Sequence, residues 1–314
     1  MATAKKQLTH NDYTVGLVYV KPLEMDAIVT MLDEEHQPLR LSQGDQNEYK
    51  LGRIGAHNVM VVGPPIGKQG KVAISTVVNQ IRLSFKNIRI GLLVGIGGGV
   101  PKHDHDVRLG DVVVGAPESG PAVVQYDLGK WNTKGIIEVT RSLGKPPRLL
   151  QNVVNRVEDQ YRRAGQNSFF TQHLKRFENI PRLNPIYCRP NHPDLLFRSD
   201  YVHEAGKECR SHNSGYQVPR KERPPGAIKL HYGTVLSGDL VMKCGKKRDE
   251  LSAQHNNALC FEMEAAGMVD TLPCLVIRGI CDYSDSHKSK EWQGYAAATA
   301  AAYAREVLYN MTEG

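Results

Sequence analysis

Four charged side chains stand inside two apolar stretches near the C-terminal end of the chain. Glu262 and Glu264 lie two residues apart in LCFEMEAAGM, and Arg278 and Asp282 close the hydrophobic run TLPCLVIRGICDYSD. Burying a charge is costly unless the charge is paired, hydrogen-bonded or used in a reaction. Glu264 and Asp282 interrupt apolar runs where an idle carboxylate would be destabilising, so the pattern indicates carboxylates that bind a ligand or exchange protons. Glu262 has a second interpretation, that of capping a helix that begins near Glu264.

A glycine-rich segment, VGIGGGVP, is another stretch that could approach a ligand closely. Glycine lets backbone amides come near a bound molecule because it has no side chain. The segment is not a P-loop, since no Gly-Lys-Ser/Thr follows it, and it does not match the dinucleotide fingerprint, which must open a helix. It predicts a ligand contact at Gly97 and Gly98 without identifying the ligand.

Strand-like runs alternate with helical patterns over most of the chain. The strands are expected at residues 13–20, 48–63, 87–99, 109–117, 122–130, 227–239, 257–264 and 274–282, and the helices at 22–35, 68–85, 246–255 and 296–311. Such alternation predicts an α/β fold, a sandwich around a mixed or parallel sheet. Ligands of such sheets bind at the carboxyl ends of the strands, where the glycine segment and the charged residues can converge.

The composition is that of a soluble globular protein, with 40% hydrophobic and 23% charged residues among 314. No uninterrupted apolar stretch reaches the roughly 20 residues that a membrane-spanning helix needs, and the N-terminus lacks the apolar segment of a secretory signal. Six cysteines are scattered, three of them inside apolar runs, which is typical of reduced thiols. We therefore expect a cytoplasmic protein without a membrane partner.

The net charge of +7 is concentrated in one segment. Residues 140–229 contain 17 Lys and Arg against 8 Asp and Glu, a balance of +9. We expect a flexible N-terminus at residues 1–12 and a single domain at 13–314, interrupted by this basic insertion at about 140–229. Inside the insertion, residues 146–165 have the pattern of an exposed helix. No basic motif interleaved with aromatic residues is present, so nucleic acid is an unlikely partner.

Two pairs of potential metal ligands also lie in the insertion. Cys188 is followed by His192, and His203 by Cys209, but this spacing matches no strong zinc signature. We therefore expect no metal and no cofactor.

The order of several motifs makes the chain resemble a known superfamily. PLEMDA, VGIGGGVP, LGDVVV, SGD, FEMEA and VIRGICDYSD are arranged as in the purine nucleoside phosphorylase and methylthioadenosine/adenosylhomocysteine nucleosidase superfamily. More narrowly, the chain looks like the fungal nucleosidase domains, including ATP nucleosidases, found alone or at the head of immune-receptor-like proteins. The resemblance covers about residues 13–130 and 228–310. It implies a three-layer sandwich around a central mixed, partly barrel-like sheet, and an N-ribosyl hydrolase that acts on an adenine nucleoside or nucleotide.

The resemblance also implies roles for the charged residues. Glu264 would accept hydrogen bonds from both ribose hydroxyls, since an ionised carboxylate can take two donors at once. Asp282 would donate a proton to the purine N7. A carboxylate on the first helix would activate water with support from Arg278; it maps onto Asp26, and Glu24 is the alternative.

The rest of the substrate is placed in the same way. The residues expected around the sugar and the purine are Glu262, Met263, Val241, Met242 and Phe261. Basic side chains would hold a phosphorylated 5′ group by charge-assisted bonds, and the candidates are Lys68, Lys71, His287, Lys288 and Lys290. Because a basic insertion fits a polyanion, ATP is the first expected substrate, cleaved to adenine and ribose triphosphate, and adenosine is the second.

Departures from the family pattern leave alternatives open. Asp26 is one methylene shorter than the usual Glu, and Cys281 replaces a hydroxyl residue that often orients the catalytic acid. The phosphate loop of the phosphorylases, G-D-P-x-R, is missing, so water is the expected nucleophile. The alternatives are a phosphate-dependent purine nucleoside phosphorylase and a catalytically inactive nucleotide-sensing module. The resemblance also implies a homo-oligomer, with a dimer as the first expectation.

Overall fold

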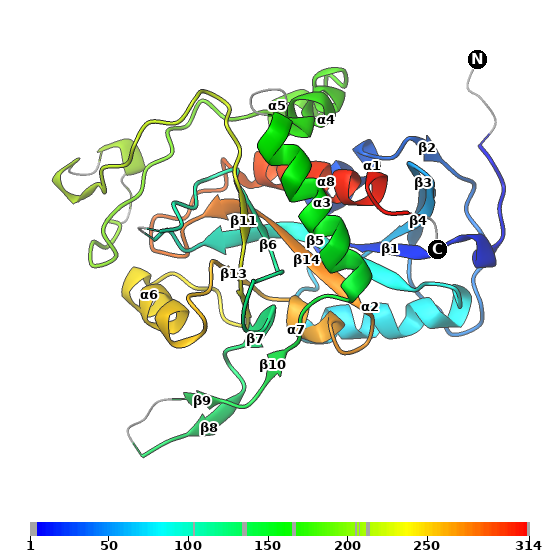
Figure 1. Cartoon of the computed structure of the whole chain (residues 1–314), viewed down its shortest axis with the longest axis horizontal. Helices are drawn as coiled ribbons and strands as arrows, with labels where there is room; N and C mark the ends of the chain where they lie inside the picture. Colours follow the sequence, from blue (N-terminus) through cyan, green and yellow to red (C-terminus); the bar gives the residue numbers. More distant parts are fainter. Residues whose placement is uncertain are drawn as a thin grey trace.

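A mixed β-sheet organises the chain around one long central strand (Figure 1). The structure, a computed structural model, describes residues 5–102, 104–133, 137–164, 168–204, 206, 208–211 and 214–312. Within these residues a 12-stranded sheet forms, and β8 (Gly129–Trp131) and β9 (Ile137–Val139) make a separate hairpin that projects from it. The predicted α/β class with a central mixed sheet is confirmed.

The central strand, β5 (Ile90–Gly99), exchanges partners along its length. Its first residues pair in parallel with β1 (Val15–Val18), and its last two pair antiparallel with β13 (Cys260–Glu262). Strand β14 (Cys274–Asp282) pairs in parallel with nearly all of β5. The sheet therefore divides near the carboxyl end of β5, and the division brings the ends of β5, β13 and β14 together.

The remaining strands extend the sheet in three directions. Beyond β1 lie β4 (His57–Val62), β3 (Tyr49–Ile54) and β2 (Glu34–Glu35); beyond β13 lie β12 (Val235–Ser237), β7 (Val123–Gln125) and β10 (Ser142–Leu143); and beyond β14 lie β6 (Val112–Val114) and β11 (Leu230–Tyr232).

Helices cover both faces of the sheet. Helices α1 (Pro22–Thr30) and α8 (Gln293–Tyr309) pack on one face, and α2 (Lys71–Ser84) and α7 (Ala265–Met268) pack on the other. Successive residues of a strand point to opposite faces, and β5 accordingly sends Leu92 to the first cluster and Leu93 to the second. This arrangement is a three-layer sandwich.

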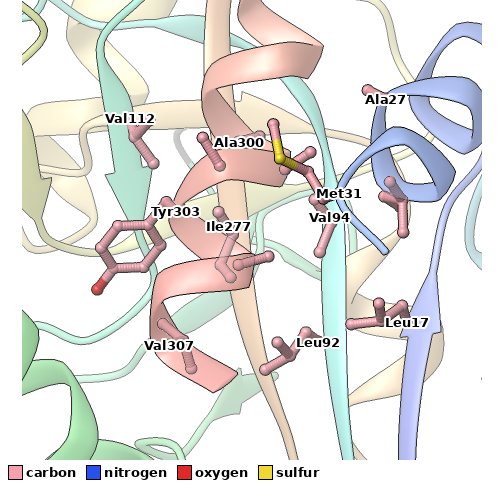
Figure 2. Packing of buried hydrophobic residues seen from close by; sticks show 14 of the residues in the cluster. Leu17, Ala27, Met31, Leu92, Val94, Val112, Ile277, Ala300, Tyr303 and Val307 are labelled. Atoms are coloured by element: carbon pink, nitrogen blue, oxygen red, sulfur yellow. The ribbon is translucent and has the colours of Figure 1, made fainter. Parts of the chain in front are cut away.

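Helix α8 lies close to the sheet because many of its buried residues are alanines. Figure 2 shows Ala300 and Val307 beside Ile277 of β14 and Leu92 of β5. A Cβ on Gly279 would collide with the carbonyl oxygen of Ala296, so α8 crosses β14 in direct backbone contact. This contact fixes the strand that carries Arg278 and Asp282.

The segment 140–229 adds helices to the layer of α8. Its described part includes α3 (Arg148–Ala164), α4 (Phe169–Glu178) and α5 (Asn184–Tyr187), and all three contact α8. The prediction of an exposed helix is wrong for one face of α3, because the stripe Leu150, Val153, Val154 and Val157 is buried. After Cys188 the described residues of the segment include two 3₁₀ turns, η3 (Cys209–Ser211) and η4 (Ser214–Tyr216).

The described part of the N-terminal segment lies against the domain. Lys6 forms a β-bridge with His36, and residues His10–Asp12 form the 3₁₀ turn η1. Across the described residues, every helix is too short or too polar to cross a membrane.

Candidate active site

A pocket of about 430 Å³ lies where β5, β13 and β14 end, beside the N-terminus of α1. Most of the side chains predicted from the sequence line it: Gly97, Gly98, Val241, Met242, Phe261, Glu262, Met263, Glu264, Asp282, Lys288 and Lys290. They come from segments almost 200 residues apart, and the division of the sheet brings them together. Phe261 also packs edge-on against Tyr126, with ring centroids 5.5 Å apart.

Arg278 is the buried cation around which the glutamates gather. Its side chain is 1% exposed, and Nη2 bonds to Glu262 and lies 3.4 Å from Glu264 Oε2. The negative charges of Glu24, Glu262 and Glu264 all raise the pKa of Arg278. Arg278 contacts the carboxylates of Glu262 and Glu264 and does not line the pocket.

The carboxylate of the first helix that enters the pocket belongs to Glu24. It is 3% exposed; Oε2 accepts the amides of Val20 and Lys21 at 2.8 Å, and Oε1 accepts the amide of Ile96 at 2.9 Å. The assignment of Asp26 to the site is therefore corrected. Asp26 is partly exposed and does not line the pocket, since two residues along an α-helix turn a side chain by about 200°.

Glu262 anchors the turn that presents Glu264. Its carboxylate accepts the amide of Glu264 at 3.0 Å and that of Ala265 at 2.9 Å, and it bonds to Arg278. These contacts agree with the interpretation that Glu262 caps the start of α7. The residue also lines the pocket, but its carboxylate is already committed to three donors.

Glu264 retains room for further hydrogen bonds. It accepts the amide of Gly70 at 3.4 Å and that of Met263 at 3.2 Å. Burial raises the pKa of Glu264 to about 7; Arg278 opposes the shift, whereas Glu262 and Glu24 add to it. The carboxyl group is therefore poised to change its charge near neutral pH when hydroxyl donors or another cation arrive.

Asp282 ends β14 at an irregularity in the strand pairing that follows Ile280. Its Oδ1 accepts the amide of Ser284 at 2.8 Å and lies 2.9 Å from Lys288 Nζ. Cys281 Sγ lies 3.4 Å from Asp282 Oδ2, so the thiol occupies a place from which it can donate to the carboxylate. Burial raises the pKa of Cys281 well above its usual value, which keeps the thiol protonated as a donor.

Three basic residues predicted for the 5′ side are not in the pocket. Lys71 lies 2.7 Å from Asp127 and 3.2 Å from Asp239, which neutralise it. Lys68 is exposed on the loop before α2. The ring of His287 is stacked on Phe197, with centroids 4.2 Å apart. These placements are corrections. Partners from distant segments hold Lys71 and His287, whereas Lys68 is exposed to solvent.

Two lysines that sequence reasoning missed do line the pocket, Lys21 and Lys243. Lys21 precedes Pro22 at the start of α1, and Lys243 follows Val241 and Met242. Their nearness in sequence to Glu24 and to the expected purine contacts was the available signal. Over the described ranges, no three His, Cys, Asp or Glu side chains form a group that could hold a metal ion.

Comparisons with known proteins agree with this geometry. No model of a protein family matches the chain. A nucleotide-binding leucine-rich repeat (NLR)-like protein of Hyaloscypha variabilis is 36% identical over 314 residues, which cover 98% of this chain but 30% of that protein. The 5′-methylthioadenosine/S-adenosylhomocysteine nucleosidase of Mycobacterium bovis is 22% identical and matches 94% of this chain and 95% of its own length.

A further relative is the death domain-containing ATP nucleosidase of Amphimedon queenslandica, which is 23% identical and matches 99% of this chain and 51% of its own length. Among solved structures, the 5′-methylthioadenosine/S-adenosylhomocysteine nucleosidase of Neisseria meningitidis in complex with methylthio-immucillin-A superposes with a TM-score of 0.60 at 16% identity, covering 94% of this chain and 98% of that one. The chain therefore has the fold of the nucleoside phosphorylase and methylthioadenosine/S-adenosylhomocysteine nucleosidase superfamily, and it is similar to nucleosidases of that superfamily over nearly its whole length.

Proposed function

We propose that the chain is a nucleosidase that hydrolyses the N-glycosidic bond of an adenine nucleoside or nucleotide. The observation that carries the proposal is the convergence of Glu24, Glu264 and Asp282 in one pocket, backed by Arg278. Three separated carboxylates match the three tasks of the reaction, which are to activate water, hold the ribose and protonate the base.

The reaction follows from these positions. Glu24 takes a proton from a water molecule as the water oxygen bonds to C1′ of the ribose. The C1′–N9 bond breaks, its electron pair moves into the purine, and Asp282 delivers a proton to N7. Glu264 accepts the ribose hydroxyls and stabilises the positive charge that develops on the sugar. Adenine leaves neutral, and solvent returns the proton from Glu24 to Asp282.

Water is favoured over orthophosphate as the nucleophile on electrostatic grounds. The amides of Val20, Lys21 and Ile96 could have bound a phosphate, but they already donate to Glu24. An added dianion would also meet Glu24, Glu262 and Glu264, which share one guanidinium. Like charges so close together in a buried site repel strongly.

We further propose that ATP is the preferred substrate. Lys21, Lys243, Lys288 and Lys290 line the pocket and give it a positive rim suited to a 5′-triphosphate. Two of the relatives named above support this choice. One is an ATP nucleosidase, and the other is an NLR-like protein. The ammonium group of Lys288 lies 2.9 Å from Asp282. Phosphates of the substrate that attract this ammonium would draw it away from Asp282.

We also propose that the protein is a homodimer and that it is located in the cytoplasm. The exposed apolar residues Ile66, Val72, Leu240 and Val241 lie on the two segments that Lys71 and Asp239 join. A second copy that covered them would also narrow the mouth of the pocket. Light scattering on the purified protein tests this, and a monomer at all concentrations would contradict it.

The activity is tested by chromatography of ATP, adenosine and methylthioadenosine after incubation with the protein, with and without orthophosphate. Free adenine in phosphate-free buffer supports hydrolysis, and the fastest release from ATP supports the nucleotide preference. Adenine that forms only with phosphate would make the protein a phosphorylase. If none of the substrates releases its base, the protein would be an inactive nucleotide-sensing module.

A further inference from the structure

The residue that follows the proposed catalytic acid is held by the segment 140–229. The side chain of Tyr283 is buried, and its hydroxyl donates to Asp194 Oδ1. Arg220 Nη1 donates to the same hydroxyl at 2.7 Å, and Arg220 Nη2 lies 3.0 Å from Asp194 Oδ1. The guanidinium also stands over the tyrosine ring, 5.4 Å from its centroid. Tyr283 thus joins two charged residues of the segment to the end of β14.

A second arginine fixes the backbone at the same point. Arg248 of α6 (Gly245–Gln254) is 3% exposed, and its Nη1 donates to the carbonyl of Tyr283 at 2.7 Å. This carbonyl and the amide of Ser284 belong to one planar peptide unit. The Ser284 amide is the donor that holds Asp282 Oδ1 at 2.8 Å. Fixing the carbonyl therefore fixes the direction of the bond that orients the acid.

The backbone of Ser284 needs such support. Its φ of 53° lies in the left-handed region, which an L-residue other than glycine adopts only when its surroundings enforce it. Arg248, Asp194 and Arg220 supply the enforcing contacts, and none of the three lines the active-site pocket. Burial raises the pKa of Tyr283 well above its usual value, so the hydroxyl stays protonated and continues to donate.

From these contacts we infer that Asp194, Arg220 and Arg248 are positioning residues that act on the acid Asp282 through Tyr283. The basic segment is therefore coupled to catalysis and is more than a surface addition. The inference rests on the proposed nucleosidase function, because it assigns these residues to the proton-transfer step of that reaction.

The sharpest test is Tyr283→Phe, which removes the hydroxyl and leaves the Asp194–Arg220 pair and the ring in place. A matched control is Tyr309→Phe, because Tyr309 also donates to an aspartate, Asp33, at 2.8 Å and accepts from an arginine, Arg305, at 2.7 Å. Tyr309, Asp33 and Arg305 do not line the active-site pocket. Both variants are assayed for adenine release over a range of pH, and their folding is checked by thermal melting.

A mispositioned acid should lower kcat by about 10-fold or more, since small displacements at a reacting centre have large effects. KM should stay within about 2-fold of the wild-type value, because Glu264, the proposed ribose contact, lies on another segment. The pH profile of kcat should change in Tyr283→Phe and remain that of the wild type in Tyr309→Phe. Arg220→Lys, which keeps the charge, should fall between the wild type and Arg220→Met.

Two outcomes would overturn the inference. One is a wild-type kcat and pH profile in folded Tyr283→Phe. The other is a loss that follows only the folded fraction, with an unchanged pH profile and no difference between Arg220→Lys and Arg220→Met. If Tyr283→Phe does not fold, the pair of Arg220 variants decides. A wild-type protein that releases no adenine contradicts the proposed function instead, so the two failures are distinguishable.

Discussion

Glu24 of α1 and Arg278 of β14 flank the backbone of Gly95 in the central strand. A Cβ on this glycine would overlap both Glu24 Oε1 and Arg278 Nη1. The absence of a side chain at one position of β5 therefore allows the carboxylate proposed to activate water and the buried guanidinium to approach each other. Arg278 also bonds to Glu262 and lies 3.4 Å from Glu264, the other two glutamates of the site.

Gly95→Ala should disturb both stability and activity. The added methyl group must push Glu24 and Arg278 apart, and overpacking of this kind costs about 1–3 kcal/mol of the free energy of unfolding. Urea unfolding and adenine release measure the two effects. Gly144→Ala is the control, because a Cβ there meets no atom within 4 Å. Equal behaviour of the two variants would show that the packing around Gly95 is not critical.

Glu24→Gln should lower kcat by about 10²–10⁴-fold, the range for loss of a general base. Asp26→Asn, two residues along the same helix, should keep nearly all activity because Asp26 does not line the pocket. Steady-state rates of adenine release from ATP compare the two. If Asp26→Asn lost more activity than Glu24→Gln, the catalytic role would return to Asp26 and the geometry described above would be contradicted.

Asp282→Asn should lower kcat by about 10²-fold or more, because an amide cannot supply the proton that the leaving purine needs. The substrate offers a complementary change. In 7-deaza-ATP a carbon replaces N7, so this analogue should inhibit the wild-type protein competitively and release no base. Rapid cleavage of the analogue would mean that protonation at N7 is not the route by which the base leaves.

The raised pKa of Glu264 predicts a pH-dependent stability. The pKa rises from 4.5 in the unfolded chain to about 7 in the folded protein. Between these values the folded state binds the proton and the unfolded state does not, so the free energy of unfolding falls as pH rises through this window. The stabilising effect of Glu264→Gln should therefore be larger at about pH 8 than at about pH 5. Thermal melting of the ligand-free wild type and variant measures the difference, and an equal difference at both values would refute the shift.

The lysines of the rim should affect ATP more than adenosine. Removing the charge of Lys21, Lys243 or Lys290 should lower kcat/KM for ATP by about 2- to 5-fold each, the scale of an exposed ion pair. The rate with adenosine should change little, and salt should weaken the effect. Lys68→Gln is the control, since Lys68 is exposed outside the pocket. If ATP and adenosine respond alike, the rim does not bind phosphate.

Most of the fold, and the chemistry of the residues on and beside β13 and β14, could be predicted from the sequence. Glu264, Arg278 and Asp282 were predictable because each interrupts an apolar run of the sequence, and the alternation of strands and helices indicated the α/β class. The choice between Asp26 and Glu24 required the phase of α1 relative to the pocket, which depends on how the helix packs. The local sequence does not determine the rotation of α1 about its axis relative to the pocket.

Other residues were misplaced because their partners are distant in the chain. Lys71 is neutralised by Asp127 and Asp239, and the ring of His287 is covered by Phe197. The buried face of α3 is a different case. Leu150, Val153, Val154 and Val157 follow the i, i+3, i+4, i+7 spacing of an amphipathic helix, so that signal was visible in the sequence although the charged face dominates its composition.

The position of β5 has a consequence for how the protein would lose activity on heating. All ten of its residues are buried, and one of them, Ile96, donates the amide that holds Glu24. Amides of such central strands exchange with solvent through global unfolding and not through local opening. Deuterium exchange at Ile96 should therefore be among the slowest in the chain, and thermal inactivation should coincide with the loss of the whole fold.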